Sequence, residues 1–240
     1  MTKEDFQNGQ VLLIDKPLKW TSFQVVNKLR WAIRQKFSIK KIKVGHAGTL
    51  DPLATGLLII CTGKFTKKIN EYQGLPKEYT GTFTLGGTTP SYDLESEINQ
   101  TFPIDHITEK LILEKKNEFI GEIKQKPPFF SAIRKDGKRL YELARKGETT
   151  EIPSRLVSIY EFEFTKIALP KLEFRVKCSK GTYIRSLAYD FGKALNSGAH
   201  LSELRRTKIG EYAVVKATDP LDFVANLHLK TNSLEAESSE

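Results

Sequence analysis

Residues 45–61 read GHAGTLDPLATGLLIIC, a glycine-rich segment that leads directly into a run of apolar residues. The glycines at 45, 48 and 56 indicate tight turns or the close approach of a bound group to the backbone. Residues 57–61 are apolar throughout, and so short a run fits a buried strand or a buried helical turn equally well. We therefore expect a shaped loop that is anchored on a buried element.

Asp51 lies in this loop between Leu50 and Pro52. An Asp N-cap followed by Pro at the first helical position is a common helix start, so this pair could simply begin a helix. Alternatively, Asp51 is a carboxylate held in a partly apolar loop as a nucleophile or base. His46 has no Cys or His companion at metal-site spacing, which favours a polar anchor. Spacing alone leaves both interpretations of Asp51 open.

Strands and helices alternate irregularly along the rest of the chain. The patterns predict strands over 11–15, 37–44, 79–85, 157–167, 172–178 and, around a turn at 210, over 200–215. They predict helices from 22 and over 64–73, 105–120, 140–145, 183–195 and 219–227, with irregular segments over 86–101 and 121–138. This mixture, without a repeat or a linker, predicts one α+β domain over 1–230 and a flexible acidic tail over 231–240.

The composition is that of a globular protein, because 39% of the 240 residues are hydrophobic and 28% are charged. The longest apolar candidate for a membrane span, residues 57–61, is far too short, and the charged N-terminus lacks the apolar region of a secretory signal. Two cysteines do not make a disulfide framework. We expect a reduced, cytoplasmic setting and no contact with a membrane.

The positive charge is concentrated in the first third of the chain. Residues 1–70 hold 13 basic and 4 acidic side chains, which accounts for the whole net charge of +9. A positive field favours a polyanionic partner, and nucleic acid is the first candidate. The alternative is a lysine-rich surface that only aids solubility.

Several motifs that bind nucleotides or metals are missing from the sequence. Gly63-Lys64 resembles the end of a P-loop, but Leu58 stands where the first glycine belongs. The sequence also has no zinc-ligand spacing, no GxGxxG after a predicted strand and no GxSxG elbow. We therefore expect no cofactor and no metal.

Six segments, in order, resemble the motifs of one enzyme family. GHAGTLDPLATGLL closely resembles the catalytic motif of the TruB family, the bacterial tRNA pseudouridine-55 synthases. The other five resemble further motifs of that family: DKP with WTS within 15–22, KEY at 77–79, QKPPFFSAIRKDGKRLYELARKG at 125–147, CSKGTYIR at 178–185, and GAH with LRRT within 198–207. Together they span about residues 11–212, which makes the resemblance far more specific than any single motif.

The resemblance implies a pseudouridine-synthase-like catalytic domain with a mixed, mainly antiparallel sheet, flanked by helices and loops, and a central cleft. It also implies that residues 125–147 form an RNA-gripping insert. Many relatives continue into a C-terminal PUA module, for which we expect no room in this chain. The segment TTPSYD at 88–93 departs from the family pattern, so no role is assigned to Thr89 or Ser91, although Asp93 remains in place.

The implied activity is isomerisation of the T-loop uridine 55 of tRNA to pseudouridine, with the base flipped out of its stack. Asp51 would be the catalytic carboxylate, although the route that it follows stays open. The resemblance implies these further roles: Tyr79 stacks on the uracil, Arg185 pairs with Asp51, Leu204 forms an apolar pocket wall, and His46 helps to splay the T-loop. Candidates for phosphate contact are Lys16, Lys19, Lys64, Lys67 and Lys68, each of which could equally be solvated surface.

The partner implied is the T-arm stem-loop of tRNA, bound by a monomer. Two alternatives stay open: a non-catalytic RNA-binding module on the same scaffold, and a relative that depends on a guide RNA. The intact set of Asp51, Tyr79 and Arg185 favours an enzyme, because a pure binder has no need of a carboxylate facing phosphates. Arg205 and Arg206 fit phosphate contact and structural pairing equally well.

Overall fold

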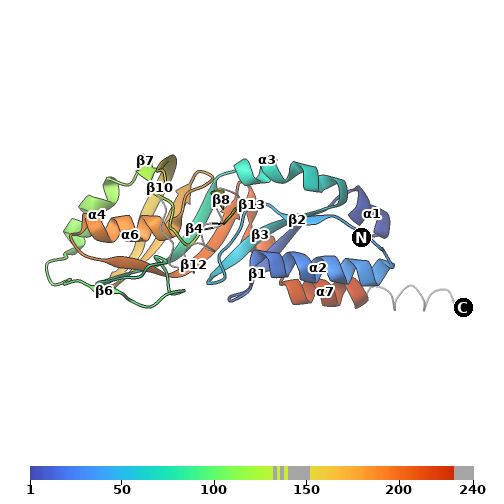
Figure 1. The fold of residues 1–240 in the computed structure, drawn as a ribbon, viewed down its shortest axis with the longest axis horizontal. Helices are drawn as coiled ribbons and strands as arrows, with labels where there is room; N and C mark the ends of the chain where they lie inside the picture. Colours follow the sequence, from blue (N-terminus) through green and yellow to red (C-terminus); the bar gives the residue numbers. More distant parts are fainter. Residues whose placement is uncertain (132–133, 136–137, 140–151, 230–240) are drawn as a thin grey trace, which may run out of the picture. The chain divides into compact units, whose positions relative to one another are not determined.

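The computed structural model describes residues 1–131, 134–135, 138–139 and 152–229. The helix predicted over 140–145, much of the insert predicted over 125–147 and the tail predicted over 231–240 therefore lie outside the described residues. The chain divides into two compact units, unit 1 with residues 1–75 and 205–240 and unit 2 with residues 76–204. Helices and mainly antiparallel strands are mixed in both units, which confirms the predicted α+β class (Figure 1).

Unit 1 is built on a small antiparallel sheet with helices on both faces. Its strands are β1 (Val11–Lys16), β2 (Val44–His46), β3 (Ala54–Thr62) and β13 (Tyr212–Ala213). Its helices are α1 (Lys3–Asn8), α2 (Ser22–Phe37), the 3-10 helix η1 (Gly63–Lys68), α3 (Ile69–Gly74), the 3-10 helix η2 (Val214–Lys216) and α7 (Pro220–Leu229). Both β1 and β2 pair with β3 in antiparallel register, and α2 and α7 lie side by side (Figure 1).

The apolar run 57–61 belongs to strand β3, not to a helical turn. Leu58 and Ile60 face the core that β3 shares with α2 and α7. Leu57, Ile59 and Cys61 point to the opposite face, where residues of η1 and α3 pack against them. Because both faces of the strand are buried, the run is continuously apolar and carries no alternation.

Unit 2 holds the larger sheet. Its elements are β4 (Lys77–Leu85), β5 (Gly87–Thr88), β6 (Gln100–Thr101), α4 (Glu109–Asn117), β7 (Gly121–Gln125), β8 (Arg134–Lys135), β9 (Lys138–Arg139), β10 (Arg155–Ala168), β11 (Lys171–Cys178) and α6 (Ile184–Ala194). The strands follow the order β4-β11-β10-β7, all antiparallel, and the predicted hairpin of β10 with β11 is confirmed. Strand β12 (Ala199–Ile209) begins in unit 2 beside β4 and ends in unit 1 beside β3.

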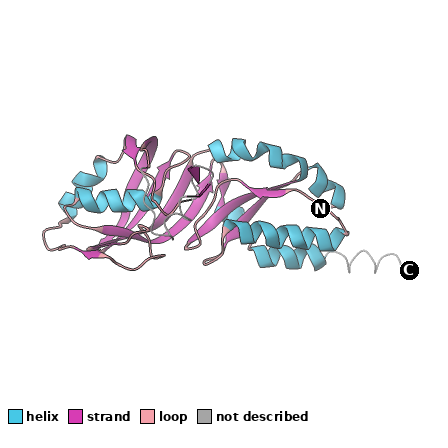
Figure 2. Ribbon diagram, viewed as in Figure 1, coloured by secondary structure: helices cyan, strands magenta, loops and turns pink. Residues whose placement is uncertain are grey.

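Aromatic side chains fill the core of unit 2. The rings of Phe83 and Phe174 lie 4.3 Å apart between centroids, and those of Phe164 and Phe191 lie 5.2 Å apart. Phe191 belongs to α6, which packs beside α4 (Figure 2). Both cysteines of the chain, Cys61 in β3 and Cys178 in β11, are buried free thiols.

Apart from the two-residue strands β5, β6, β8 and β9, which lie in segments predicted to be irregular, two expectations about secondary structure are wrong. The strand predicted over 37–44 is instead the end of α2 and an irregular segment, because Ser38 adopts a left-handed φ of 50° that ends the helix. Its alternating Ile39, Ile42 and Val44 are buried against α2 without pairing as a strand before Val44. Residues 121–125, predicted to be irregular, form strand β7, which pairs with β10. In the part of the chain that the structure describes, no helix has the length and apolar character to cross a membrane.

Candidate active-site loop and basic surface

Asp51 lies in the loop that connects β2 to β3, and its side chain is partly exposed. No helix begins at Pro52, so the interpretation of Asp51 as an N-cap is wrong. Instead β3 begins at Ala54, whose N–H donates to the carbonyl oxygen of Asp51 at 3.1 Å. The carboxylate is therefore presented by a tight turn at the entrance to a fully buried strand.

Two short segments hold this loop in place. The hydroxyl of Ser22 donates to the carbonyl oxygen of Leu50 at 3.0 Å and accepts from its N–H at 2.9 Å. The backbone N–H of Lys19 donates to the carbonyl oxygen of Pro52 at 2.8 Å, and Lys19 has a left-handed φ of 67°. The anchoring role of Ser22 could not be foreseen, because the sequence showed only a helix start at Thr21-Ser22.

Lys16 is fully buried, with an exposed fraction of 0%. Its Nζ donates to the carbonyl oxygens of Pro17 at 2.9 Å, Trp20 at 2.6 Å and Pro52 at 3.4 Å. Burial lowers the pKa of Lys16 to about 8; the charge of Asp51 opposes this shift and the charge of Arg206 adds to it. A phosphate contact needs an accessible ammonium group, so the burial of Lys16 disfavours the contact that was predicted for it. Lys16 instead ties β1 to the Asp51 loop.

The two adjacent arginines of β12 are structural. Arg206 is 1% exposed and donates from Nε to the carbonyl oxygen of Leu57 at 2.7 Å and from Nη2 to that of Gly48 at 3.0 Å. Arg205 makes a bidentate ion pair with Asp15, at 3.0 and 2.6 Å. These contacts favour structural pairing over phosphate contact, the two interpretations that the sequence left open.

Gly48 in the loop and Gly56 near the start of β3 both have left-handed backbones, with φ of 102° and 104°. A Cβ at Gly56 would overlap the backbone of Arg206, whereas one at Gly48 would lie 3.6 Å from Nη1 of the same residue. At Gly56 the structure shows a close approach of the neighbouring strand β12 to β3, whereas the close approach of a bound group, predicted for these glycines, stays a prediction.

His46 lies in β2 opposite Ile60. Burial lowers its pKa from 6.5 and the charge of Arg206 lowers it further, so the imidazole is neutral at pH 7. Within the described residues, its buried Nδ1 has no hydrogen-bond partner. In unit 1, Arg206 thus lies close enough to His46 and Lys16 to affect their pKa values, and Lys16 lies in the same way close to Asp51.

The other predicted site residues belong to unit 2. Arg185, in the first turn of α6, is 3% exposed, and its guanidinium donates to the carbonyl oxygens of Ser91 at 3.1 Å and Phe130 at 2.9 Å. Its Nε lies 3.5 Å from the buried carboxylate of Asp93. Tyr79 lies in β4 opposite Val176 and is 9% exposed, and Leu204 in β12 is half-buried. Arg185 is therefore a buried, paired arginine and not a solvated helix residue.

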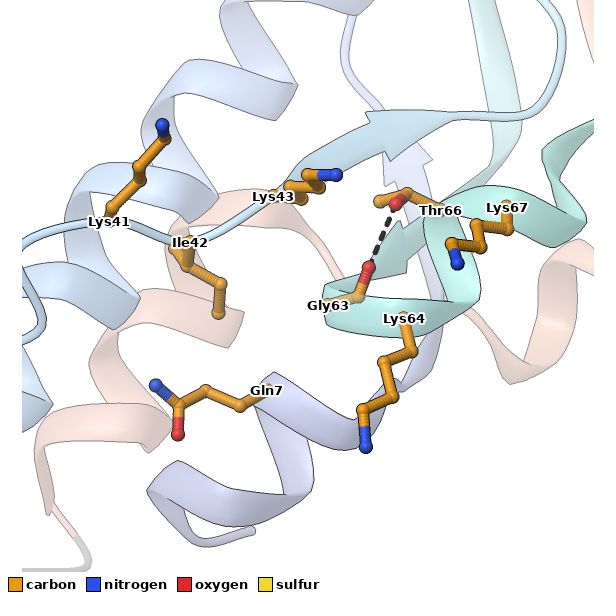
Figure 3. Close-up of a pocket in the computed structure, with 8 residues that line it drawn as sticks. All are labelled: Gln7, Lys41, Ile42, Lys43, Gly63, Lys64, Thr66 and Lys67. Carbon is orange, nitrogen blue, oxygen red and sulfur yellow. Dashed lines mark hydrogen bonds between the residues drawn. The ribbon is translucent and has the colours of Figure 1, made fainter.

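A basic pocket of about 280 Å³ lies at the far end of the β2–β3 hairpin (Figure 3). Its lining includes the exposed Lys41 and Lys43, which precede β2, and the exposed Lys64 and Lys67, which belong to η1. No ion pair joins any of these four ammonium groups to a carboxylate of the described residues. This pocket is therefore suited to an anion.

Strand β3 separates the basic pocket from the Asp51 loop. The loop precedes Ala54 and the lysines of η1 follow Thr62, so the two sites lie at opposite ends of this strand. At about 3.3 Å per residue, the strand places them roughly 25 Å apart. A single anionic ligand that reaches both must therefore be a long one.

The sequence of the chain matches two family models. The one described as "TruB family pseudouridylate synthase (N terminal domain)" matches residues 34–184, and the one described as "tRNA pseudouridylate synthase B C-terminal domain" matches residues 185–238. Among curated proteins, the tRNA pseudouridine synthase B of Flavobacterium johnsoniae is 70% identical over 95% of this chain and all of that protein. The protein of the same name from Parabacteroides distasonis is 52% identical over 97% of this chain and 99% of that protein.

Solved structures agree with this match. A chain in "Crystal Structure of a Cbf5-Nop10-Gar1 Complex" is 31% identical with a TM-score of 0.70, over 97% of this chain and 59% of that one. A chain in "Structure of H/ACA RNP bound to a substrate RNA containing 2'-deoxyuridine" is 29% identical with a TM-score of 0.68, over 95% of this chain and 56% of that one. The chain thus spans little more than half the length of these solved chains. From the family models and the extent of these identities, we conclude that the chain belongs to the TruB family of pseudouridylate synthases.

Proposed function

We propose that the protein converts uridine 55 in the T-loop of tRNA to pseudouridine and that Asp51 is the catalytic carboxylate. Family membership already makes the chain a pseudouridine synthase, which is an isomerase. The observation that carries the assignment of Asp51 is its place in the fold. It is a partly exposed carboxylate on a loop fixed at both ends, with the buried cations Lys16 and Arg206 behind it.

The chemistry explains why such a carboxylate is needed. The bond between N1 of uracil and C1′ of the ribose breaks, the ring turns, and C5 bonds to C1′ while its proton moves to a ring nitrogen. Nothing is oxidised and no group is imported, so the proposed reaction needs no cofactor. A carboxylate can act at C1′, at C6 or on a sugar proton, and each of these routes requires it to be ionised and held in place.

RNA fits the rest of unit 1. The basic pocket and the Asp51 loop lie roughly 25 Å apart, so a polyanion can occupy the lysines while its target nucleotide lies at the loop. A uridine inside a folded T-loop is out of reach of any side chain, and we therefore propose that it is flipped out. A neutral His46 ring is suited to stacking beside the position that the base leaves.

The residues of unit 2 take the roles that the family resemblance implies. We propose Tyr79 as the aromatic platform for the uracil ring, Leu204 as an apolar wall beside it, and Arg185 as the cationic partner of the catalytic carboxylate. The T-arm as the recognised element, a single catalytic domain, a monomeric state and a cytoplasmic location remain predictions.

The test is incubation of the purified protein alone with a T-arm stem-loop, followed by mass-labelled detection of pseudouridine. We expect Asp51→Asn to abolish turnover while RNA binding stays close to wild type, because the substitution removes charge at constant shape. Asp15→Asn is the matched control, since Asp15 is also a partly exposed carboxylate of unit 1 but is paired with Arg205.

Two results would refute the proposal. Turnover by Asp51→Asn within about tenfold of wild type, roughly 1.4 kcal/mol, would show that Asp51 is not the catalytic group. Tight binding without any product, even by the wild-type protein, would favour the non-catalytic RNA-binding module.

A further inference from the structure

The two tryptophans of the chain line one pocket on the outer face of α2. Trp20, Gln24, Asn27, Lys28 and Trp31 line an open pocket of about 440 Å³. Gln24, Asn27, Lys28 and Trp31 are spaced by three and four residues and lie on one stripe of α2, opposite the buried Val25, Leu29 and Ala32, while Trp20 directly precedes the helix. Trp31 is 54% exposed, which is unusual for so large an apolar side chain on the solvent face of an amphipathic helix.

The polar groups around this pocket offer hydrogen-bond donors. Oε1 of Gln24 accepts from the backbone N–H of Thr21 at 2.7 Å, and Oδ1 of Asn27 accepts from Arg30 at 2.8 Å. Both amide oxygens are thus used within the helix, which leaves the two NH₂ groups for a ligand. The ammonium group of Lys28 lies 5.7 Å from the ring centre of Trp31 and adds a cation. The pocket therefore combines two indole rings with donors, and it suits a flat ligand that carries carbonyl oxygens and a nearby negative charge.

The surroundings of the pocket are strongly basic. Residues 16–50 contain nine Lys or Arg side chains and no Asp or Glu, and α2 alone contributes Lys28, Arg30, Arg34 and Lys36. This charge favours a polyanion over an acceptor-rich neutral molecule. Aromatic platforms with amide donors and cations are the means by which proteins hold unpaired nucleotides, because every base has a face to stack and carbonyl or ring acceptors at its edge.

The pocket is also joined to the Asp51 loop. Nζ of Lys16 donates to the carbonyl oxygen of Trp20 and to that of Pro52, and Ser22 at the start of α2 is hydrogen-bonded to Leu50. A group bound against Trp20 therefore lies beside the segments that fix the loop. An RNA whose target nucleotide is at Asp51 has further nucleotides within reach of this pocket.

We propose that the Trp20–Trp31 pocket binds an unpaired base of the substrate RNA, at a nucleotide other than the one that is isomerised. The proposal rests on the RNA substrate of the proposed function but not on the catalytic role of Asp51. The base stacks against the indole rings, its carbonyl oxygens accept from Gln24 and Asn27, and Lys28 contacts a neighbouring phosphate.

Intrinsic fluorescence tests this directly, because both tryptophans of the protein line the pocket. The full chain carrying Asp51→Asn is titrated with oligouridylate of about eight nucleotides, and separately with an abasic ribose-phosphate oligomer of the same length. We expect the oligouridylate to quench the fluorescence and the abasic oligomer, which presents the same charge, to leave it nearly unchanged. Equal quenching by both, or by neither, would overturn the proposal.

Variants provide the second measurement. Stacking contributes roughly 1–3 kcal/mol per base, so Trp31→Ala should weaken oligouridylate binding about 5- to 150-fold, while Trp31→Phe should retain most of the affinity. Phe23→Ala is the matched control, since Phe23 is an aromatic residue of α2 that is 61% exposed and does not line the pocket. Wild-type affinity in Trp31→Ala, or quenching by a polyglutamate peptide to the extent seen with oligouridylate, would refute a base site.

The same variants separate this proposal from the proposed function. In proteins that keep Asp51, Trp31→Ala should raise the KM for the RNA substrate, and Phe23→Ala should not. If the wild-type protein binds oligouridylate with quenching but forms no pseudouridine, the proposed function fails and the base site stands. If pseudouridine forms normally and Trp31→Ala changes neither affinity nor KM, the base site fails alone.

Discussion

Among the residues that the structure describes, each unit buries one arginine, and the two are satisfied in different ways. Arg206 in unit 1 is bound by the carbonyl oxygens of Leu57 and Gly48, and the buried Lys16 close by is bound by three more carbonyls. Arg185 in unit 2 also binds two carbonyls, but it lies against the buried carboxylate of Asp93 as well. In unit 1 the hydrogen-bond partners of the two buried cations are carbonyl oxygens, whereas the buried cation of unit 2 also has a buried carboxylate beside it.

The strongest test of this difference between the two units is to replace each buried arginine by methionine. Arg185→Met leaves the carboxylate of Asp93 buried without its cation, so the free energy of unfolding should fall by about 3–5 kcal/mol. Arg206→Met leaves only carbonyl oxygens, and the expected loss is about 2 kcal/mol. Urea denaturation of both variants measures the difference.

A second substitution checks the cause. Adding Asp93→Asn to Arg185→Met should recover at least about 1 kcal/mol, because the uncompensated charge disappears. If both arginine variants lose the same stability and the double variant recovers nothing, the two units do not differ in the way proposed here.

The contact between β12 and the start of β3, just after the Asp51 loop, can be probed by substitutions that change no charge. Gly56→Ala should cost about 3 kcal/mol, because the new Cβ would overlap the backbone of Arg206 in addition to the strain of a left-handed φ. Gly48→Ala has nearly the same φ but only an ordinary contact with Arg206, so about 1–2 kcal/mol is expected. Thermal unfolding of the two variants separates the effect of overlap from that of backbone strain. Equal losses of stability would show that β12 does not approach β3 closely at Gly56.

The burial of Lys16 in unit 1 makes the stability of the protein depend on pH. Its pKa is about 8 in the folded protein and 10.5 ordinarily, so between these values the unfolded chain binds more protons and stability rises with pH. The stability of the wild type relative to Lys16→Met should therefore rise by about 3 kcal/mol between pH 7 and 10.5. The buried thiols, whose pKa values are raised, make stability fall as the pH rises. Because both proteins contain these thiols, their effect cancels in the difference in stability between the wild type and Lys16→Met. A flat difference would mean that the ammonium group is well solvated.

The smallest expected effect concerns the basic pocket of unit 1. Each lysine that contacts a phosphate contributes roughly 0.7–0.9 to the slope of log K against log salt. Lys43→Ala and Lys67→Ala should each lower that slope by about this amount for a T-arm stem-loop, whereas Lys177→Ala of unit 2, which is paired with Glu161, should leave it unchanged. Unchanged slopes for all three would place the phosphates elsewhere.

Predictions of secondary structure are confirmed where a pattern of apolar residues has a single structural explanation. The alternation in 157–167 and 172–178 reflects one buried face and predicted the β10–β11 hairpin. The alternation around Ile39 and Ile42 misled, because burial against α2 produces the same spacing without a pairing strand. Asp51-Pro52 is typical of a helix start, but no helix forms there. The apolar run that follows is buried on both faces as strand β3.

The sequence also could not show which charges are buried. Lys16, Arg205 and Arg206 look like any other basic residues of an RNA-binding surface, and only the fold shows that carbonyl oxygens and Asp15 bind them. Arg185 likewise resembles a surface helix residue until Phe130 and the segment from Ser91 to Asp93 enclose it. Motif order predicted which residues matter, while their burial depends on contacts between segments far apart in the chain.

Burial of both thiols has a practical consequence for spectroscopy. Cys61 is 0% exposed and Cys178 is 1% exposed, and burial raises the pKa of each to about 11. At pH 7 only about one in ten thousand of such groups is a thiolate, so we expect maleimides and alkylating reagents not to react with them. A cysteine introduced on the exposed face of α2 and another on α4 would then be the sole reactive positions. Paired dyes or spin labels attached there could follow the distance between the two units as RNA binds, with no background from the native chain.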